Sequence, residues 1–231
     1  MKETFRTHKT LYNGWRKEQL TALIRGMEEM KDELCEAVFK DLGRDAFATE
    51  LLELGTIKNS AQWDMANLEK MTKDEVVDTE LVLGPGTTLI HYEPLGVCGI
   101  YGAWNYPYVV TLKPLIQCIT SGNCALIKPS EIAVHSGLAV KKLVEKYLDT
   151  DCFQVLLGGV DVATKLNHLK LDLICFTGST FVGKIVAQAA GKNMIPCIME
   201  LGGKCPVIID RTANMENTVS KVCFGRFTNS G

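Results

Sequence analysis

Four short motifs place chemically useful side chains directly after apolar, strand-like runs. They are Trp104-Asn105-Tyr106-Pro107, Lys128-Pro129-Ser130-Glu131, Thr177-Gly178-Ser179-Thr180-Phe181-Val182-Gly183 and Met199-Glu200-Leu201-Gly202-Gly203-Lys204. In a parallel sheet the carboxyl ends of the strands meet at one edge, and such sheets bind their ligands there. These strand ends are therefore the candidate site.

The run from Gly178 to Gly183 can meet a phosphate group. Gly178 allows a tight turn, and Gly183 lets a helix start close to the sheet, so that free N–H groups at the helix end can contact a pyrophosphate. The spacing is G-x-x-x-x-G, not the G-x-G-x-x-G fingerprint, and the run lacks the Gly-Lys pair of a P-loop. Taken alone, the run is more typical of a plain strand-to-helix turn.

Two other motifs each have a chemical and a structural interpretation. Lys128 could donate to ribose hydroxyls and Glu131 could accept from them, or Ser130 could cap the following helix while the charges stay solvated. Asn105 could direct its side-chain N–H₂ at a developing oxyanion, or stand in a turn before a helix with Pro107 in its first turn.

Glu200 interrupts an apolar run, so we expect its side chain to be partly buried. A carboxylate in a hydrophobic cleft could serve as a general base. A paired, structural glutamate is the alternative, and the residues alone do not decide between the two.

The nine cysteines form no metal or redox motif, because no two are spaced as C-x-x-C. They are spread through apolar surroundings, as in Leu173-Ile174-Cys175-Phe176. We expect reduced, buried, structural thiols in a cytosolic compartment. The nine are Cys35, Cys98, Cys118, Cys124, Cys152, Cys175, Cys197, Cys205 and Cys223.

The composition is that of a globular protein and excludes several classes. The 231 residues include 25 Lys and Arg against 27 Asp and Glu, for a net charge of −2, with 46% hydrophobic and 23% charged residues. This balance argues against disorder and gives no electrostatic reason to expect nucleic acid. No apolar run has the length of a membrane span, and residues 1–6 lack the apolar region of a secretory signal. We expect a cytoplasmic location.

The first third of the chain predicts helices and then a hairpin. Apolar residues recur at three- and four-residue steps over 20–38 and again over 51–68, which predicts two helical stretches. Gly43 is expected to end the first of them. Two β-prone runs, 76–83 and 87–92, flank Gly84-Pro85-Gly86, which predicts a β-hairpin.

From residue 95 onward strands and helices alternate, which predicts an α/β fold with a Rossmann-like, doubly wound parallel sheet. The predicted strands are 95–102, 124–128, 153–157, 171–176 and 196–200. The predicted helices are 107–121, 136–147, 161–168 and 181–190, followed by a last helix over 215–227. The predicted division is 1–74 helical, 75–93 hairpin, 94–205 dinucleotide-binding domain and 206–231 the start of a further domain.

Together and in this order, the four motifs resemble those of the aldehyde dehydrogenase superfamily, and the likeness extends over nearly all 231 residues. The run from Gly102 to Pro107, and the lack of a long arm before the first helix, are most similar to the fatty aldehyde, or class 3, branch. The resemblance implies oxidation of aldehydes, expected to be medium- or long-chain fatty aldehydes, to carboxylic acids with NAD or NADP. It also implies a homodimer in the full-length form, with residues 76–92 as the oligomerisation element.

The resemblance also implies a role for each motif residue, since family roles transfer position by position. Asn105 would supply the oxyanion-hole amide, and Tyr106 would lie next to the substrate. The remaining residues would be Lys128 and Glu131 at the adenosine ribose, Gly178, Ser179 and Gly183 at the pyrophosphate, Leu201, Gly202 and Gly203 at the nicotinamide, and Glu200 at the hydrolytic water. Glu131 would favour a free 2′-hydroxyl, although class 3 enzymes resemble some that accept both cofactors.

The nucleophilic cysteine of the family is not among these residues. In the family it lies in a Gly-Gln-x-Cys run, and Gly231 matches the glycine, so the cysteine would follow three positions later. We expect the N-terminal part of a longer enzyme with a truncated catalytic domain, inactive alone, and a C-terminal membrane tail could follow. The alternative is a non-catalytic cofactor-binding or oligomerisation module that pairs with full-length relatives.

Overall fold

A parallel sheet forms the centre of the computed structural model, which describes residues 1–230. The five strands lie in the order β5-β4-β3-β6-β7, and every neighbouring pair is parallel. Their bounds are β3 (Val97–Tyr101), β4 (Cys124–Lys128), β5 (Phe153–Val155), β6 (Leu173–Gly178) and β7 (Cys197–Leu201). The first strand of the sheet, β3, lies at its centre. The chain adds β4 and β5 on one side of β3 and then returns to add β6 and β7 on the other side, so the strand order reverses between β3 and β6. The predicted doubly wound sheet is confirmed.

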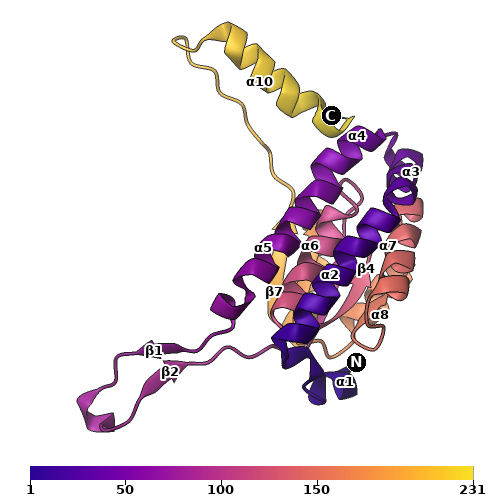
Figure 1. Ribbon diagram of the computed structural model, residues 1–231. Coiled ribbons are helices and arrows are strands. Elements are labelled where there is room, and N and C mark those ends of the chain that lie inside the picture. Colours follow the sequence, from indigo (N-terminus) through magenta and orange to yellow (C-terminus); the bar gives the residue numbers. More distant parts are fainter. Residues whose placement is uncertain (231) are drawn as a thin grey trace.

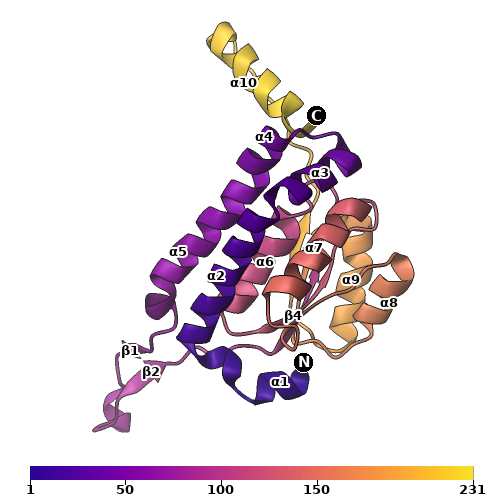
Figure 2. The same ribbon diagram turned by 45° about the vertical axis from the view of Figure 1, so that its right-hand side comes forward.

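Helices cover both faces of the sheet. The helices α6 (Val109–Thr120) and α7 (Val134–Tyr147) pack against β3, β4 and β5, whereas α9 (Thr180–Lys192) packs against β6 and β7. With α8 (Val160–Asn167), α9 lies on the side of the sheet away from the N-terminal helices (Figure 2). Right-handed crossovers require this change of face once the winding direction reverses. The strands β3 and β4 are consequently buried throughout.

The N-terminal helices form a further layer over α6 and α7 (Figure 1). The long members are α2 (Asn13–Glu29), α3 (Lys31–Leu42) and α5 (Gly55–Met71), and the short ones are α1 (Lys2–Arg6), η1 (Lys9–Leu11), α4 (Ala46–Thr49) and the π-helical turn η2 (Glu50–Leu54). Each long helix of this layer contributes a fully buried side chain: Leu20 on α2, Leu34 on α3 and Ile57 on α5. Met30 divides the first predicted helical stretch in two, and Gly43 ends it with a φ of 67°.

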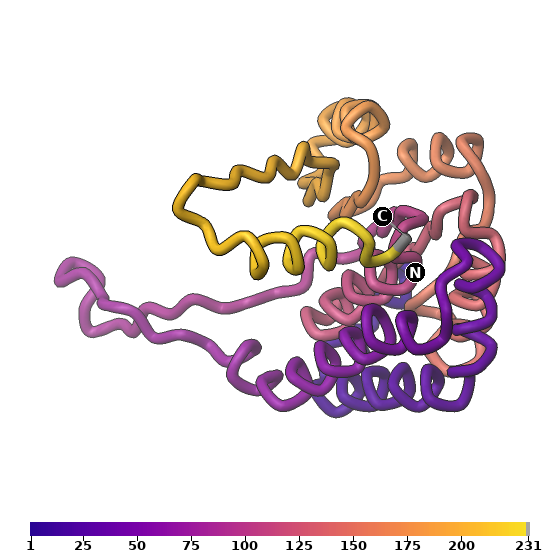
Figure 3. The backbone as a smooth tube through the Cα atoms, turned by 90° about the horizontal axis from the view of Figure 1, so that it is seen from above, coloured from indigo at the N-terminus to yellow at the C-terminus, as the bar shows by residue number. Residues whose placement is uncertain are grey.

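The hairpin is shorter than predicted. Its strands β1 (Glu75–Val77) and β2 (Thr88–Ile90) pair antiparallel, and the whole segment extends away from the body of the molecule (Figure 3). Residues 81–83 form the 3₁₀ turn η3 (Leu81–Leu83) instead of continuing the strand. Local bonds such as Leu83 N–H to Glu80 O, at 2.9 Å, use the N–H groups that a longer ladder would need.

The chain leaves β7 as an extended segment and ends in α10 (Met215–Phe227) and η4 (Thr228–Ser230). The bounds of α10 are those predicted, and Asn214 caps it by accepting from Asn217 N–H at 2.9 Å. The helix stands away from the sheet (Figure 1). None of the helices described in residues 1–230 is long and apolar enough to cross a membrane. Gly231, the predicted match to the nucleophile run, lies outside the described residues.

Candidate functional site

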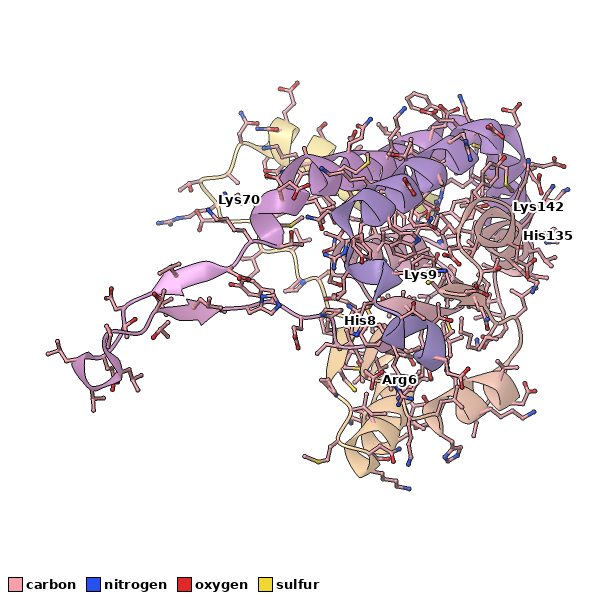
Figure 4. All side chains as sticks on the ribbon, turned by 60° about the horizontal axis from the view of Figure 1, so that its bottom comes forward. Arg6, His8, Lys9, Lys70, His135 and Lys142 are labelled. Atoms are coloured by element: carbon pink, nitrogen blue, oxygen red, sulfur yellow. The ribbon has the colours of Figure 1, made fainter. Side chains whose placement is uncertain are left out.

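A cavity of about 790 Å³ lies at the carboxyl ends of β3, β4, β6 and β7, where the strand order reverses. Its volume is in the range of small-molecule sites. Residues of all four sequence motifs line it: Asn105, Lys128, Ser130, Glu131, Gly178, Ser179, Glu200, Leu201 and Gly202. An open groove of about 610 Å³ between α3 and α7, marked by His135 and Lys142 in Figure 4, contains none of them. The motifs therefore converge on one place in the fold.

Lys128 and Glu131 form a donor–acceptor pair on the wall of this cavity. Lys128 ends β4 and is 5% exposed, and its Nζ donates to Glu131 Oε2 at 2.9 Å and to the Pro129 carbonyl oxygen at 3.2 Å. Desolvation alone would raise the pKa of the Glu131 carboxyl. The hydrogen bonds from Lys128 and the backbone outweigh it and hold that pKa below its usual range. The pair therefore presents a cation and an ionised carboxylate side by side.

Ser130 does not cap the helix that follows it, contrary to the structural alternative for its motif. The helix α7 begins at Val134, and Asp41 reaches its first turn from the end of α3. The carboxylate oxygens of Asp41 accept from the N–H groups of His135, at 3.1 Å, and Ser136, at 2.7 Å. A cap supplied from 95 positions away leaves no local sequence signal.

The glycine-containing run after β6 opens α9. Ser179 is the N-cap: its Oγ accepts from Val182 N–H at 3.3 Å, and its carbonyl oxygen accepts from Gly183 N–H at 2.9 Å. The first N–H groups of a helix have no partner inside it. The N–H groups of Thr180 and Phe181 are therefore the donors that α9 can offer to an anionic ligand in the cavity.

Gly183 allows α9 to approach the sheet closely, and Gly178 leaves room for the Phe176 ring. A Cβ at Gly183 would lie 2.6 Å from Leu201 Cδ2, and a Cβ at Gly178 would lie 2.7 Å from Cζ of the Phe176 ring. The prediction that Gly183 serves close helix–sheet packing agrees with this geometry. Gly183 lies within α9, however, because the helix already begins at Thr180.

The Asn105 loop, residues 102–108, connects β3 to α6. The helix α6 begins at Val109, so Pro107 precedes it and does not occupy its first turn as predicted. The carbonyl oxygen of Asn105 accepts from Arg44 Nη2 at 2.5 Å and from Asn229 Nδ2 at 3.0 Å. Both Asn105 and Asn229 line the cavity. Tyr106 does not line it: its ring lies against the Arg44 guanidinium, with 5.0 Å from Cζ to the ring centroid.

Arg44 and Glu53 form a buried ion pair next to this loop, and sequence reasoning did not identify either residue. Arg44 is 4% exposed and Glu53 is fully buried. Glu53 Oε2 accepts from the N–H groups of Tyr108, at 2.7 Å, and Val109, at 2.9 Å. Burial raises the pKa of the Glu53 carboxyl, and the bonds from Val109 N–H and Arg44 oppose that rise. A glutamate inside the apolar run Leu51-Leu52-Glu53-Leu54 was the available signal.

Glu200 is exposed, so the expectation of partial burial is wrong. The strand β7 is an edge of the sheet in the described residues: it pairs with β6 alone, with Glu200 opposite Thr177. With no neighbour on its other side, the strand leaves Glu200 and Leu201 open to solvent. Burial, and then the charge of Glu200, raise the pKa of Cys175 to about 11, which keeps that thiol protonated near neutral pH.

The cysteines follow the expectation in part. All nine are free, and five are buried. Cys205 and Cys223 are exposed, because they lie on the extended segment after β7 and on α10, both of which stand away from the core. Cys205 does not line the cavity.

Comparisons with known proteins match the whole chain. A family model described as "Aldehyde dehydrogenase family" matches residues 1–231. The chain is 39% identical over 230 residues to 4,4'-diaponeurosporen-aldehyde dehydrogenase of Staphylococcus aureus, covering 100% of this chain and 50% of that protein. It is 38% identical over 231 residues to Aldehyde dehydrogenase family 3 member B3 of Mus musculus, covering 100% and 48%.

Solved structures give the same relationship. The substrate-bound state of Staphylococcus aureus AldH matches with a TM-score of 0.97 and 38% identity, over 100% of this chain and 50% of that chain. PnpE in complex with nicotinamide adenine dinucleotide matches with a TM-score of 0.87 and 25% identity, over 99% and 47%. The chain spans about half the length of the relatives it matches. Because the family model covers every residue and the four motifs meet at one cavity, the chain belongs to the aldehyde dehydrogenase family.

Proposed function

We propose that this chain is the cofactor-binding part of an NAD(P)⁺-dependent dehydrogenase that oxidises medium- and long-chain fatty aldehydes to carboxylic acids. The observation that carries the proposal is the convergence of all four motifs on the cavity at the reversal of strand order. Family 3 members among the relatives support aldehyde oxidation. The presence of a dinucleotide in the PnpE structure supports a nicotinamide cofactor.

The residues of the cavity fit a dinucleotide. Lys128 Nζ donates to the ribose hydroxyls and the Glu131 carboxylate accepts from them, as their 2.9 Å pairing on the cavity wall allows. Gly178 and Ser179 border the pyrophosphate, which meets the N-terminal N–H groups and the positive dipole end of α9. The negative charge of Glu131 repels a 2′-phosphate, so NAD⁺ is favoured over NADP⁺. A bound nicotinamide would supply the hydride acceptor.

The reacting carbonyl lies between the Asn105 loop and β7 in this proposal. The side-chain N–H₂ of Asn105 donates to the oxygen as negative charge develops on it, when the cysteine nucleophile expected from the family adds to the carbonyl carbon. Glu200 accepts a proton from the hydrolytic water. Leu201 and Gly202, which line the cavity, border the nicotinamide. Tyr106 stays outside this set of contacts, because its ring packs on the Arg44 guanidinium.

The proposed division of the chain follows the predicted boundaries: 1–74 helical, 75–93 hairpin, 94–205 cofactor-binding, and 206–231 the start of the catalytic domain. We assign the hairpin to homodimer formation, because Leu81, Val82 and Leu83 at its tip are 101%, 83% and 61% exposed. Contiguous exposed apolar residues of this kind mark interaction surfaces. Replacing Leu81 by glutamate should then shift the species seen by analytical ultracentrifugation from dimer to monomer. An unchanged sedimentation profile would remove the hairpin from the interface.

Activity is tested in the natural polypeptide that carries these residues, by following NADH formation with aldehydes of increasing chain length. We expect turnover that improves with chain length and is lost in Asn105→Ala. The matched control is Asn67→Ala, since Asn67 lies on the exposed face of α5, where its side chain donates to the Trp63 carbonyl oxygen at 2.8 Å. NAD⁺ binding without turnover would favour the alternative of a non-catalytic cofactor-binding module, and absence of both would overturn the proposal.

A further inference from the structure

The Arg44–Glu53 ion pair holds both ends of the short segment that carries Asn105. At one end, Arg44 Nη2 donates to the Asn105 carbonyl oxygen at 2.5 Å. At the other end, Glu53 Oε2 accepts from Tyr108 N–H at 2.7 Å and from Val109 N–H at 2.9 Å. The two side chains are joined through Arg44 Nη1 and Glu53 Oε1. One buried pair from the α3–η2 region therefore determines where the β3–α6 connection lies.

Further contacts restrict the same segment. The Tyr106 ring packs on the guanidinium of Arg44, with the Arg44 Cζ 5.0 Å from the ring centroid, an arrangement that suits cation–π attraction. Asn229, which follows α10, gives the Asn105 carbonyl oxygen a second donor at 3.0 Å. The Asn105 carbonyl is thus held from residues 61 positions before it and 124 positions after it.

We propose that Arg44 and Glu53 are positioning residues that fix the direction in which the Asn105 amide points into the cavity. The inference rests on the proposed function, in which that amide donates to the developing oxyanion. Electrostatic stabilisation needs a donor that is already aimed at the oxygen, and small displacements of such a donor are costly. Anchoring the Asn105 carbonyl restricts rotation of the backbone from which its side chain projects.

The geometry requires arginine at position 44. A guanidinium presents N–H groups in a rigid planar fork, so one group reaches Glu53 while another reaches the Asn105 carbonyl. A lysine ammonium keeps the charge opposite Glu53 but lacks this fork. Arg44→Lys therefore separates the positioning role from the simple need to neutralise a buried carboxylate.

The test compares Arg44→Lys with Arg16→Lys. Arg16 is an equally buried arginine, 5% exposed, and donates to the carbonyl oxygens of Thr10, at 2.8 Å, and Thr120, at 3.0 Å, away from the cavity. Hydrogen exchange of the backbone amides in residues 103–110 is measured by mass spectrometry. We expect exchange of this segment to accelerate at least about tenfold in Arg44→Lys and to stay within about twofold of the parent in Arg16→Lys.

A milder variant covers the case in which Arg44→Lys does not fold. In Glu53→Gln the amide oxygen still accepts from Tyr108 and Val109 N–H but carries no charge, so the same segment should exchange faster while β4 stays protected. The inference is wrong if neither variant accelerates exchange over 103–110. It is also wrong if Arg16→Lys accelerates exchange there as much as Arg44→Lys does.

Kinetics in the natural polypeptide separate this inference from the proposed function. We expect Arg44→Lys to lower kcat roughly tenfold while leaving the KM for NAD⁺ unchanged, because the cofactor contacts are untouched. If Asn105→Ala lowers kcat and Arg44→Lys does not, the positioning role fails and the proposed function stands. If Asn105→Ala leaves kcat unchanged, the oxyanion role fails, whatever the exchange data show.

Discussion

Replacing Lys128 by methionine removes one ammonium group from the cavity wall and keeps a long apolar stem in its place. The Lys128 Nζ has three N–H donors and directs two of them at Glu131 and the Pro129 carbonyl oxygen. One donor therefore remains for a ribose hydroxyl. A hydrogen bond that involves a charged group contributes about 1.5–3 kcal/mol. The dissociation constant for NAD⁺ should accordingly rise about tenfold to hundredfold.

Stability should change little in Lys128→Met. Methionine fills the space of the lysine stem, and the Glu131 side chain is 47% exposed, so its carboxylate stays hydrated after its partner is lost. Titration calorimetry with NAD⁺ measures the affinity, and Lys165→Met, which removes the same charge from the exposed side of α8, is the control. A dissociation constant within about twofold of the parent in Lys128→Met, or an equal loss in the control, would refute the assignment of Lys128.

Three further predictions concern the framework of the site. In Gly183→Val the new Cβ would lie 2.6 Å from Leu201 Cδ2, so overpacking should cost roughly 1–3 kcal/mol in urea unfolding and weaken NAD⁺ binding. Asp41→Ala removes the cap from α7 and should cost about 1–2 kcal/mol in the same assay. The hydrogen bond to Asp74, and then its charge, raise the pKa of His91, so Asp74→Asn should lower the midpoint of the His91 NMR titration. The stabilisation from this pair is fully present below the ordinary histidine pKa of 6.5 and is lost as the pH rises through the raised value.

Each of these has a contradicting result. If Gly183→Val unfolds with the same urea midpoint as the parent, then α9 and β7 are not as close as they are in the structure. The same midpoint in Asp41→Ala would mean that α7 needs no cap from α3. A His91 titration that is unchanged in Asp74→Asn would exclude the pair as the cause of the raised pKa.

The parallel sheet was predictable from the sequence because each of its strands is a short apolar run bounded by turn residues. The helix α10 was predicted with its observed bounds, and in the structure Asn214 caps its first turn. Hairpin length was not predictable in this way. Residues 81–83 have β-prone side chains, yet a local turn bond takes the N–H of Leu83, and all three side chains are exposed, so packing does not favour a strand there.

The candidate site divides along the same line between local and distant contacts. Residues of all four motifs could be selected from the sequence, because each motif follows a recognisable strand end, and the structure brings residues of each motif to one cavity. The residues that anchor the Asn105 loop and cap α7 could not be predicted, because the contacts join distant parts of the sequence. Arg44 binds Asn105 over a separation of 61 positions, and Asp41 binds Ser136 over a separation of 95 positions. Exposure of Glu200 was missed for a related reason, since a one-dimensional pattern does not tell an edge strand from a central one.

The most direct test of the account is a titration of the chain with NAD⁺, followed residue by residue through backbone amide NMR shifts. Binding at the carboxyl edge of the sheet should move the signals of residues 128–131 and 178–183 first, with Asn105 and residues 200–202 responding at the nicotinamide end. The groove between α3 and α7 should be silent. Shifts confined to that groove, or no shifts at millimolar NAD⁺, the weak end of nucleotide affinities, would contradict a dinucleotide site in this cavity.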